Sequence, residues 1–325
     1  MNIQQKLKII QKISGLTQAK LAAKIGVSFV AFNNWFLGKS QPRKSALKKI
    51  DQLYKEYTGE REISDDGLSA KKSALTSKSK RFRNILKRIV NNPDIYDAFI
   101  LALTYHSNRI EGSTLSENET AAILFENAVL PDKTLVEQLE AKNHQTAIKF
   151  LFDHLAGAKP IDEALILRLH AILLNGIQRD AGFYRRHGVR IVGANVPTAN
   201  FLKVPDLMKN LAYDISKKKK DVIAGISDIH SRFEQIHPFA DGNGRIGRLI
   251  MQAILLSNNL PPAIITQEKK VLYLKYLNIS QTKGDSNPLE DFVCDAIFEG
   301  FKILERQKNE KKKFSTQGVG KRPME

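Results

Sequence analysis

The sequence has 325 residues, of which 42% are hydrophobic and 26% charged, as is ordinary for a soluble globular protein with one large domain or two smaller ones. Its single cysteine, Cys294, excludes an internal disulfide, and no apolar run is long enough to cross a membrane. The formal net charge is +17 and the N-terminus lacks the apolar stretch of a secretory signal, so we expect a cytoplasmic protein without membrane association.

The positive charge is concentrated at the two ends of the chain. Residues 1–57 contain eleven Lys and Arg against two Asp and Glu, and residues 302–325 contain eight against three. The C-terminal excess predicts a solvated basic tail. The N-terminal excess favours a nucleic-acid partner, because it coincides with a recognisable pattern of helices.

Residues 5–57 show the spacing of several short helices. A second helix is expected to begin after Thr17, which is a capping residue, and to stop at Gly26. Ser28 can cap a third helix, which Gly38 closes. Two short helices joined through a glycine are typical of a helix-turn-helix, because glycine permits the tight turn between them.

This stretch resembles the lambda-repressor-like helix-turn-helix family. The resemblance rests on Gln18, on the Gly-Val-Ser turn that ends at Ser28, on Trp35 and on the segment Gly38-Lys-Ser-Gln-Pro. It covers about residues 5–57 and implies that the domain binds DNA.

Two positions depart from that family's pattern. Phe29 and Val30 stand in the third helix where side chains are usually polar, and base edges are read mainly by hydrogen-bonding groups. The DNA-contacting residues that the resemblance implies are Gln18, Ser28, Asn33, Asn34, Lys39 and Arg43. The alternative is a basic helical module that binds protein or the rest of this chain.

The remainder of the chain is predicted to be mostly helical. Residues 58–82 are polar and aperiodic and are interpreted as a linker or a loosely held helix. Ser116 and Glu119 form the capping box of a later helix. The only segment with strand character is residues 188–193, which are rich in β-branched residues and flanked by glycine.

Residues 237–248, His-Pro-Phe-Ala-Asp-Gly-Asn-Gly-Arg-Ile-Gly-Arg, carry the clearest chemical signal. A glycine-rich loop that leads into a helix presents free N–H groups and the positive end of the helix dipole, which together favour a phosphate. Arg245 and Arg248 can both face that anion, Asp241 can bind Mg²⁺ beside it, and His237 can accept a proton at neutral pH. The alternative is a turn with a capping aspartate, a core histidine and two surface arginines.

These twelve residues match the signature of the Fic family at every defined position, and the resemblance extends over about residues 95–300. It implies an all-α helical bundle with one β-hairpin flap, and transfer of AMP from ATP, with Mg²⁺, to a Ser, Thr or Tyr hydroxyl of a protein. His237 is then the general base and Asp241 the metal ligand. The nucleotide-binding residues implied are Gly242, Asn243, Gly244, Arg245, Arg248, the flap residues Val192, Gly193, Ala194 and Asn195, and Tyr273 at the adenine.

The segment from Ser107 to Gly112 resembles the inhibitory motif of the same family. Glu111 is expected to pair with Arg248 in the space that the γ-phosphate needs, so that ATP binds with its α-phosphate misaligned. The alternative is an ordinary glutamate at a helix end, paired with a surface arginine.

We therefore predict four segments: a helix-turn-helix domain at 1–57, a linker at 58–82, a Fic domain with its inhibitory helix at 83–305, and a basic tail at 306–325. The leading function is protein adenylylation, including self-modification, held back by Glu111. Alternatives are removal of AMP from a modified protein, and a DNA-binding regulator whose Fic domain senses nucleotide. The expected partners are a target protein and DNA, with a homodimer left open.

Overall fold

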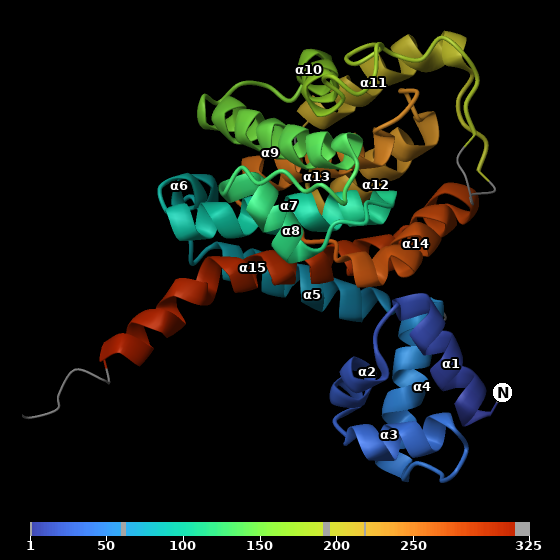
Figure 1. Ribbon diagram of the computed structural model, residues 1–325. Coiled ribbons are helices and arrows are strands. Elements are labelled where there is room, and N and C mark those ends of the chain that lie inside the picture. The colour runs from blue at the N-terminus through green and yellow to red at the C-terminus, as the bar shows by residue number, and fades with distance from the viewer. Residues whose placement is uncertain (1, 60–62, 191–195, 218, 316–325) are drawn as a thin grey trace, which may run out of the picture.

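The computed structural model describes residues 2–59, 63–190, 196–217 and 219–315. Within these residues the secondary structure is helical and no strand is found, so the all-α prediction is confirmed for the described chain. Two separate hydrophobic cores divide the molecule into a small N-terminal domain and a larger one (Figure 1).

The small domain consists of α1 (Ile3–Ser14), α2 (Gln18–Ile25), α3 (Phe29–Phe36) and α4 (Lys44–Thr58). The predicted caps are confirmed, because the Thr17 and Ser28 side chains accept hydrogen bonds from backbone N–H groups of α2 and α3. Gly26 adopts a φ of 79°, which a glycine tolerates without steric cost, and so allows the turn between the two helices. Phe32 of α3 is completely buried in the core of the domain.

Most of the segment interpreted as a linker or a loosely held helix is a helix, α5 (Asp65–Ser79), which packs along α15 (Asn287–Ser315). Lys71 pairs with Asp291 and Asp295, each at 2.7 Å, and Lys72 pairs with Glu290 and with Asp221 at 2.6 Å. Only Leu68 and Leu75 supply large buried side chains. The helix is therefore attached mainly by ion pairs, which hydrophobic periodicity does not reveal.

The larger domain contains α6 (Ile85–Val90), α7 (Pro93–Glu111), α8 (Glu117–Phe125), α9 (Leu135–Ala156), α10 (Glu163–Leu173), α11 (Val204–Ser216), α12 (Val222–Ile236), α13 (Asn243–Ser257), α14 (Lys270–Lys283) and α15. The capping box of α8, formed by Ser116 and Glu119, is confirmed. Helix α13 lies at the centre and packs against α7, α9, α10 and α12, which bury nearly all of its side chains. Its N-terminus is therefore held rigidly.

The predicted strand and β-hairpin flap are not found among the described residues. Residues 188–190 and 196–200 on either side have no strand structure. The flap residues Val192, Gly193, Ala194 and Asn195 lie outside the described residues.

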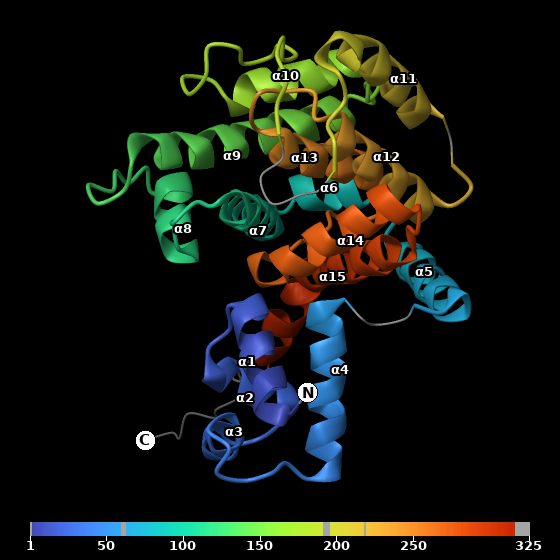
Figure 2. The same ribbon diagram turned by 90° about the vertical axis from the view of Figure 1, so that its right-hand side faces the viewer.

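The two domains touch where α4 ends. The α4 helix runs from the part of the small domain that carries α3 up to α14, as Figure 2 shows. There the Lys275 ammonium group donates a hydrogen bond to the Thr58 carbonyl oxygen. None of the described helices combines the length and the apolar character that a membrane crossing requires.

Candidate active site

The loop that joins α12 to α13 begins and ends in left-handed backbone conformations. His237 closes α12 with a φ of 50°, and Gly242 precedes α13 with a φ of 76°. Between them, the Asn243 side chain exchanges two hydrogen bonds of 2.9 Å with the backbone N–H and C=O of Phe239. Asn243 therefore fixes the loop through its side chain, while its backbone N–H at the start of α13 is left for a ligand.

Arg185 holds the start of this loop, a role that the sequence did not reveal. Its Nε donates to the His237 carbonyl oxygen at 2.7 Å, and its backbone N–H donates to the Pro238 carbonyl oxygen at 3.0 Å. Its Nη1 donates to the carbonyl oxygen of His187 at 2.7 Å. The arginine is buried, so it orients the loop instead of meeting a ligand.

The His237 imidazole is oriented by one hydrogen bond. Its Nδ1 lies 3.2 Å from the Glu234 carbonyl oxygen, which can only accept, so Nδ1 carries the proton and Nε2 is the basic nitrogen. Burial lowers the pKa of His237 from its ordinary value of 6.5, although the Glu234 carbonyl opposes this. The side chain is therefore a neutral base at pH 7.

The N-terminus of α13 faces the same cleft. Its first intrahelical hydrogen bond runs from Ile246 N–H to the Gly242 carbonyl, so the N–H groups of residues 243–245 lack partners in the helix. The Glu111 carboxylate lies close over this end, since a Cβ built on Gly244 would be 2.3 Å from Glu111 Oε1. Unpaired N–H groups and the helix dipole both favour an anion at this place.

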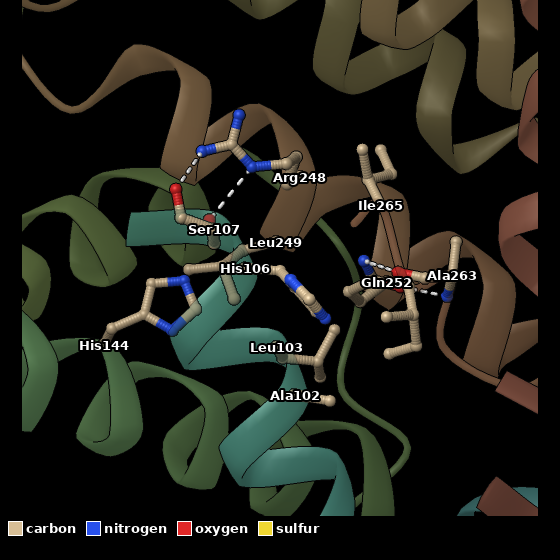
Figure 3. Close-up of a pocket in the computed structure, with 11 residues that line it drawn as sticks. Ala102, Leu103, His106, Ser107, His144, Arg248, Leu249, Gln252, Ala263 and Ile265 are labelled. Carbon is tan, nitrogen blue, oxygen red and sulfur yellow. Dashed lines mark hydrogen bonds between the residues drawn. The ribbon is translucent and has the colours of Figure 1, made fainter. Parts of the chain in front are cut away.

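Arg248 is the partner that holds this carboxylate. Its Nη2 donates to Glu111 Oε1 at 2.6 Å. Its Nε donates to Ser107 Oγ at 2.9 Å, as Figure 3 shows. The Arg248 side chain is 6% exposed, whereas that of Glu111 is 37% exposed. Burial raises the pKa of Glu111, but the charge and hydrogen bond of Arg248 outweigh it and the pKa is lowered. Glu111 is therefore ionised at neutral pH.

Arg245, expected to face the phosphates, is buried and paired within the protein. Its Nη1 donates to Glu140 Oε1 at 2.6 Å, and its Nη2 lies 3.6 Å from Asp241 Oδ2. Glu140, from α9, escaped the sequence analysis because no motif separates it from the other acidic residues of that helix. The structure thus assigns the two arginines different surroundings, with Arg245 behind the loop and Arg248 at the cleft.

The cleft has a volume of about 520 Å³, within the usual range of small-molecule sites. It brings together His237, Asp241, Arg248 and Glu111, with Tyr273 and other residues of α14 forming its apolar wall. The Tyr273 hydroxyl contacts His230 Nε2, so its polar group is already occupied. Behind Arg248, a second small cavity lies between α7, α9 and α13 (Figure 3).

Three other buried groups surround the cleft in uncharged form. Burial raises the pKa of Glu234 to about 8 and lowers that of His230 to about 3. His170 accepts a hydrogen bond from Gly182 N–H at 2.8 Å and stacks on Phe239, and burial lowers its pKa to about 4. Both histidines are buried and hydrogen bonded within the protein, so they support the cleft from behind.

Asp241 suits a magnesium ion that is bound mainly by a nucleotide. Its side chain is 53% exposed, with Oδ1 accepting from Gly242 N–H and Oδ2 from Gln178. The described residues contain no cluster of three acidic, histidine or cysteine side chains that could hold a metal alone. One accessible carboxylate beside an anion site fits Mg²⁺, which takes few protein ligands and completes its shell with phosphate oxygens and water.

The residues expected to contact DNA lie in the small domain. Ser28 is the N-cap of α3, while Asn33 and Asn34 are half-buried on that helix. Gln18 begins α2, and both Lys39 and Arg43 are exposed in the connection to α4.

The fold and the loop define a helical domain, with a cleft that favours an anion, joined to a helix-turn-helix domain. Residues 160–255 match the Fic/DOC family, and residues 10–60 match the helix-turn-helix family. The chain therefore carries a Fic domain together with a helix-turn-helix domain.

Curated proteins resemble a part of this chain. Protein adenylyltransferase Fic from Nematostella vectensis is 34% identical over 200 residues, covering 58% of this chain and 45% of that protein. Protein adenylyltransferase fic-1 from Caenorhabditis briggsae is 32% identical over 195 residues, covering 58% and 38%. This chain thus spans less than half the length of these curated relatives.

Solved structures share the fold. Fic-1 from C. elegans superposes with a TM-score of 0.65 at 21% identity, covering 90% of this chain and 86% of that one. A Fic-domain signaling protein from Bacteroides thetaiotaomicron gives a TM-score of 0.63 at 22% identity, covering 74% and 98%.

Proposed function

We propose that this protein transfers AMP from ATP to a Ser, Thr or Tyr hydroxyl of a target protein, as the names of its curated relatives suggest. The observation that carries the proposal is the shared cleft of His237 and the α13 N-terminus. A base with a free Nε2 and a site for phosphate lie together there, which is what nucleotidyl transfer needs.

In this reaction the target hydroxyl oxygen attacks the α-phosphorus of ATP. The new P–O bond forms as the bond to the β-phosphate oxygen breaks, and pyrophosphate leaves. His237 Nε2 takes the hydroxyl proton, while the N–H groups of residues 243–245 and the Arg248 guanidinium bind phosphate oxygens. Mg²⁺, held by Asp241 and the phosphates, would neutralise part of their charge.

Glu111 is the proposed brake on this reaction. Its carboxylate already occupies the anion site at α13 and the Nη2 of Arg248. A triphosphate that enters must displace this carboxylate or bind with its phosphates shifted, and a misplaced α-phosphate slows in-line attack by orders of magnitude.

A cytoplasmic location and a homodimer stay predictions.

The proposal is tested by incubating wild type, Glu111→Gly and His237→Ala with ATP and Mg²⁺ and weighing the intact proteins. We expect a mass increase of one AMP, greatest for Glu111→Gly and absent for His237→Ala. Glu126→Gly, a change of an exposed glutamate at the end of α8, is the matched control and should behave as wild type.

The result that contradicts the proposal is clear. If Glu111→Gly labels neither itself nor any lysate protein, the protein is not an adenylyltransferase. The reverse reaction is tested with a protein that already carries AMP as the substrate. Release of AMP by wild type that is lost in Glu111→Gly would show that removal of AMP dominates over its transfer.

A further inference from the structure

The outer face of α3 exposes large apolar side chains that the fold does not use. Phe29 is 51% exposed, Val30 is 66% exposed and Leu37, which follows the helix, is 52% exposed. The opposite face of α3 supplies the core, where Phe32 and Trp35 are buried. Exposed apolar groups that gather on one face indicate a binding surface.

The part of the sequence that forms this face carries only positive charges. The first fifty residues contain ten Lys and Arg and no Asp or Glu. Five of these cations are exposed on α2 and around the α3–α4 connection, namely Lys20, Lys24, Lys39, Arg43 and Lys44. A partner must therefore offer apolar groups at its centre and negative charge at its rim.

The major groove of DNA has this arrangement. In a helix-turn-helix, the first residues of the second helix reach base edges, while neighbouring residues contact phosphates. Thymine methyl groups line the groove and pack against apolar side chains, and an asparagine can pair with adenine. Asn33 follows Val30 by three residues, and Leu37, at the end of α3, follows Asn33 by four. The three side chains therefore lie on the same side of the helix.

We infer that Phe29 and Val30 recognise thymine methyl groups, beside adenine contacts from Asn33 or Asn34, so that the protein selects A·T-containing duplex DNA. Figure 2 shows α3 at the end of the small domain that lies away from the larger one, where a duplex can reach it. An acidic protein surface would satisfy the charge, but the helix-turn-helix arrangement, with Ser28 capping α3, matches DNA. Phosphate contacts hold the duplex and the apolar residues provide the choice of sequence.

The test uses the full-length protein. Random duplexes are selected for binding at a fixed salt concentration, and the selected duplex is then compared with one that carries deoxyuridine in place of thymine. Deoxyuridine lacks only the methyl group and keeps the base pairing and the charge. We expect enrichment of A·T pairs and roughly fourfold weaker binding for each contacted methyl removed, which corresponds to about 0.8 kcal/mol.

Three variants assign the effect to side chains. Phe29→Ala and Val30→Ala should weaken binding to the thymine duplex and bring the thymine-to-deoxyuridine ratio close to one. Lys39→Ala should weaken binding to both duplexes equally. Val129→Ala, a change of an 83%-exposed valine in the larger domain, is the matched control and should change neither.

Two results would overturn the inference. One is equal affinity for the thymine and deoxyuridine duplexes. The other is a folded protein that enriches no duplex from the selection, as a protein-binding surface would. DNA recognition is independent of AMP transfer, so His237→Ala should bind the selected duplex like wild type even if no adenylylation is ever detected.

Discussion

The candidate active-site cleft and the outer face of α3 use the same kinds of side chain in opposite ways. At the cleft Arg248 is buried and contacts Glu111, and behind the loop Arg245 is buried and contacts Glu140. On the small domain the cations are exposed, and Phe29 and Val30 point their apolar side chains into solvent. Buried, paired arginines select a single ligand of matching shape and charge, whereas exposed cations suit an extended polyanion.

The largest expected effect concerns the buried ion pair of Arg245, and it tests whether buried and exposed ion pairs differ in this protein. Glu140→Ala leaves that guanidinium buried without its 2.6 Å partner, and we expect a loss of about 3–5 kcal/mol in the free energy of unfolding. Chemical denaturation measures it. Asp51→Ala removes a more exposed pair, that of Lys6, and should cost only about 0.2–1 kcal/mol. Equal losses in the two variants would show that the buried pair has no special role.

The second effect isolates the charge of Glu111. Glu111→Gln keeps the shape of the side chain but loses the charge-assisted bond to Arg248, so a triphosphate displaces it more easily. We expect transfer of AMP to rise by roughly tenfold or more, since one such hydrogen bond is worth about 1.5–3 kcal/mol. Initial rates with labelled ATP measure this. A rate equal to that of wild type would mean that the side chain blocks the site by its bulk.

The loop of residues 237–248 could be recognised from the sequence because its signature is contained in twelve consecutive residues. The pairing of Glu111 with Arg248 was also predicted, because a short motif marks Glu111. Arg185 and Glu140 were missed, since each acts on a group that is distant in sequence, 52 residues away for Arg185 and 105 for Glu140. Nothing in the local pattern identifies which basic or acidic side chain will cross that distance.

The segment interpreted as a linker shows the same limit. Its polar, aperiodic sequence suggested a linker or a loosely held helix, but the acidic partners of Lys71 lie on α15, far along the chain. Hydrophobic periodicity detects helices that bury an apolar face, and α5 buries little besides Leu68 and Leu75. By contrast, the caps at Thr17, Ser28 and Ser116 were predictable because they depend on neighbours only three residues away.

The third prediction concerns pH and tests whether the cleft is as buried as its contacts indicate. Burial lowers the pKa of His237 below 6.5, so its neutral, basic form persists as the pH falls to that value. In Glu111→Gly, kcat/KM should therefore stay level down to pH 6.5 and decline only below it, by about tenfold per pH unit once the histidine is protonated. A decline that begins above pH 6.5 would contradict this, because the histidine would then be exposed or paired with an acid.

The smallest effect distinguishes the two kinds of group on the α3 face. Lys39 is exposed, and a phosphate contact from it would release about one counterion. Lys39→Ala should therefore reduce the slope of log Kd against log salt by about 0.9, while Val30→Ala should leave the slope unchanged. Titrations of the selected duplex at several salt concentrations measure both slopes. A lower slope for Val30→Ala would mean that the apolar residues position the phosphate contacts, so that affinity and sequence choice are not separate properties of this face.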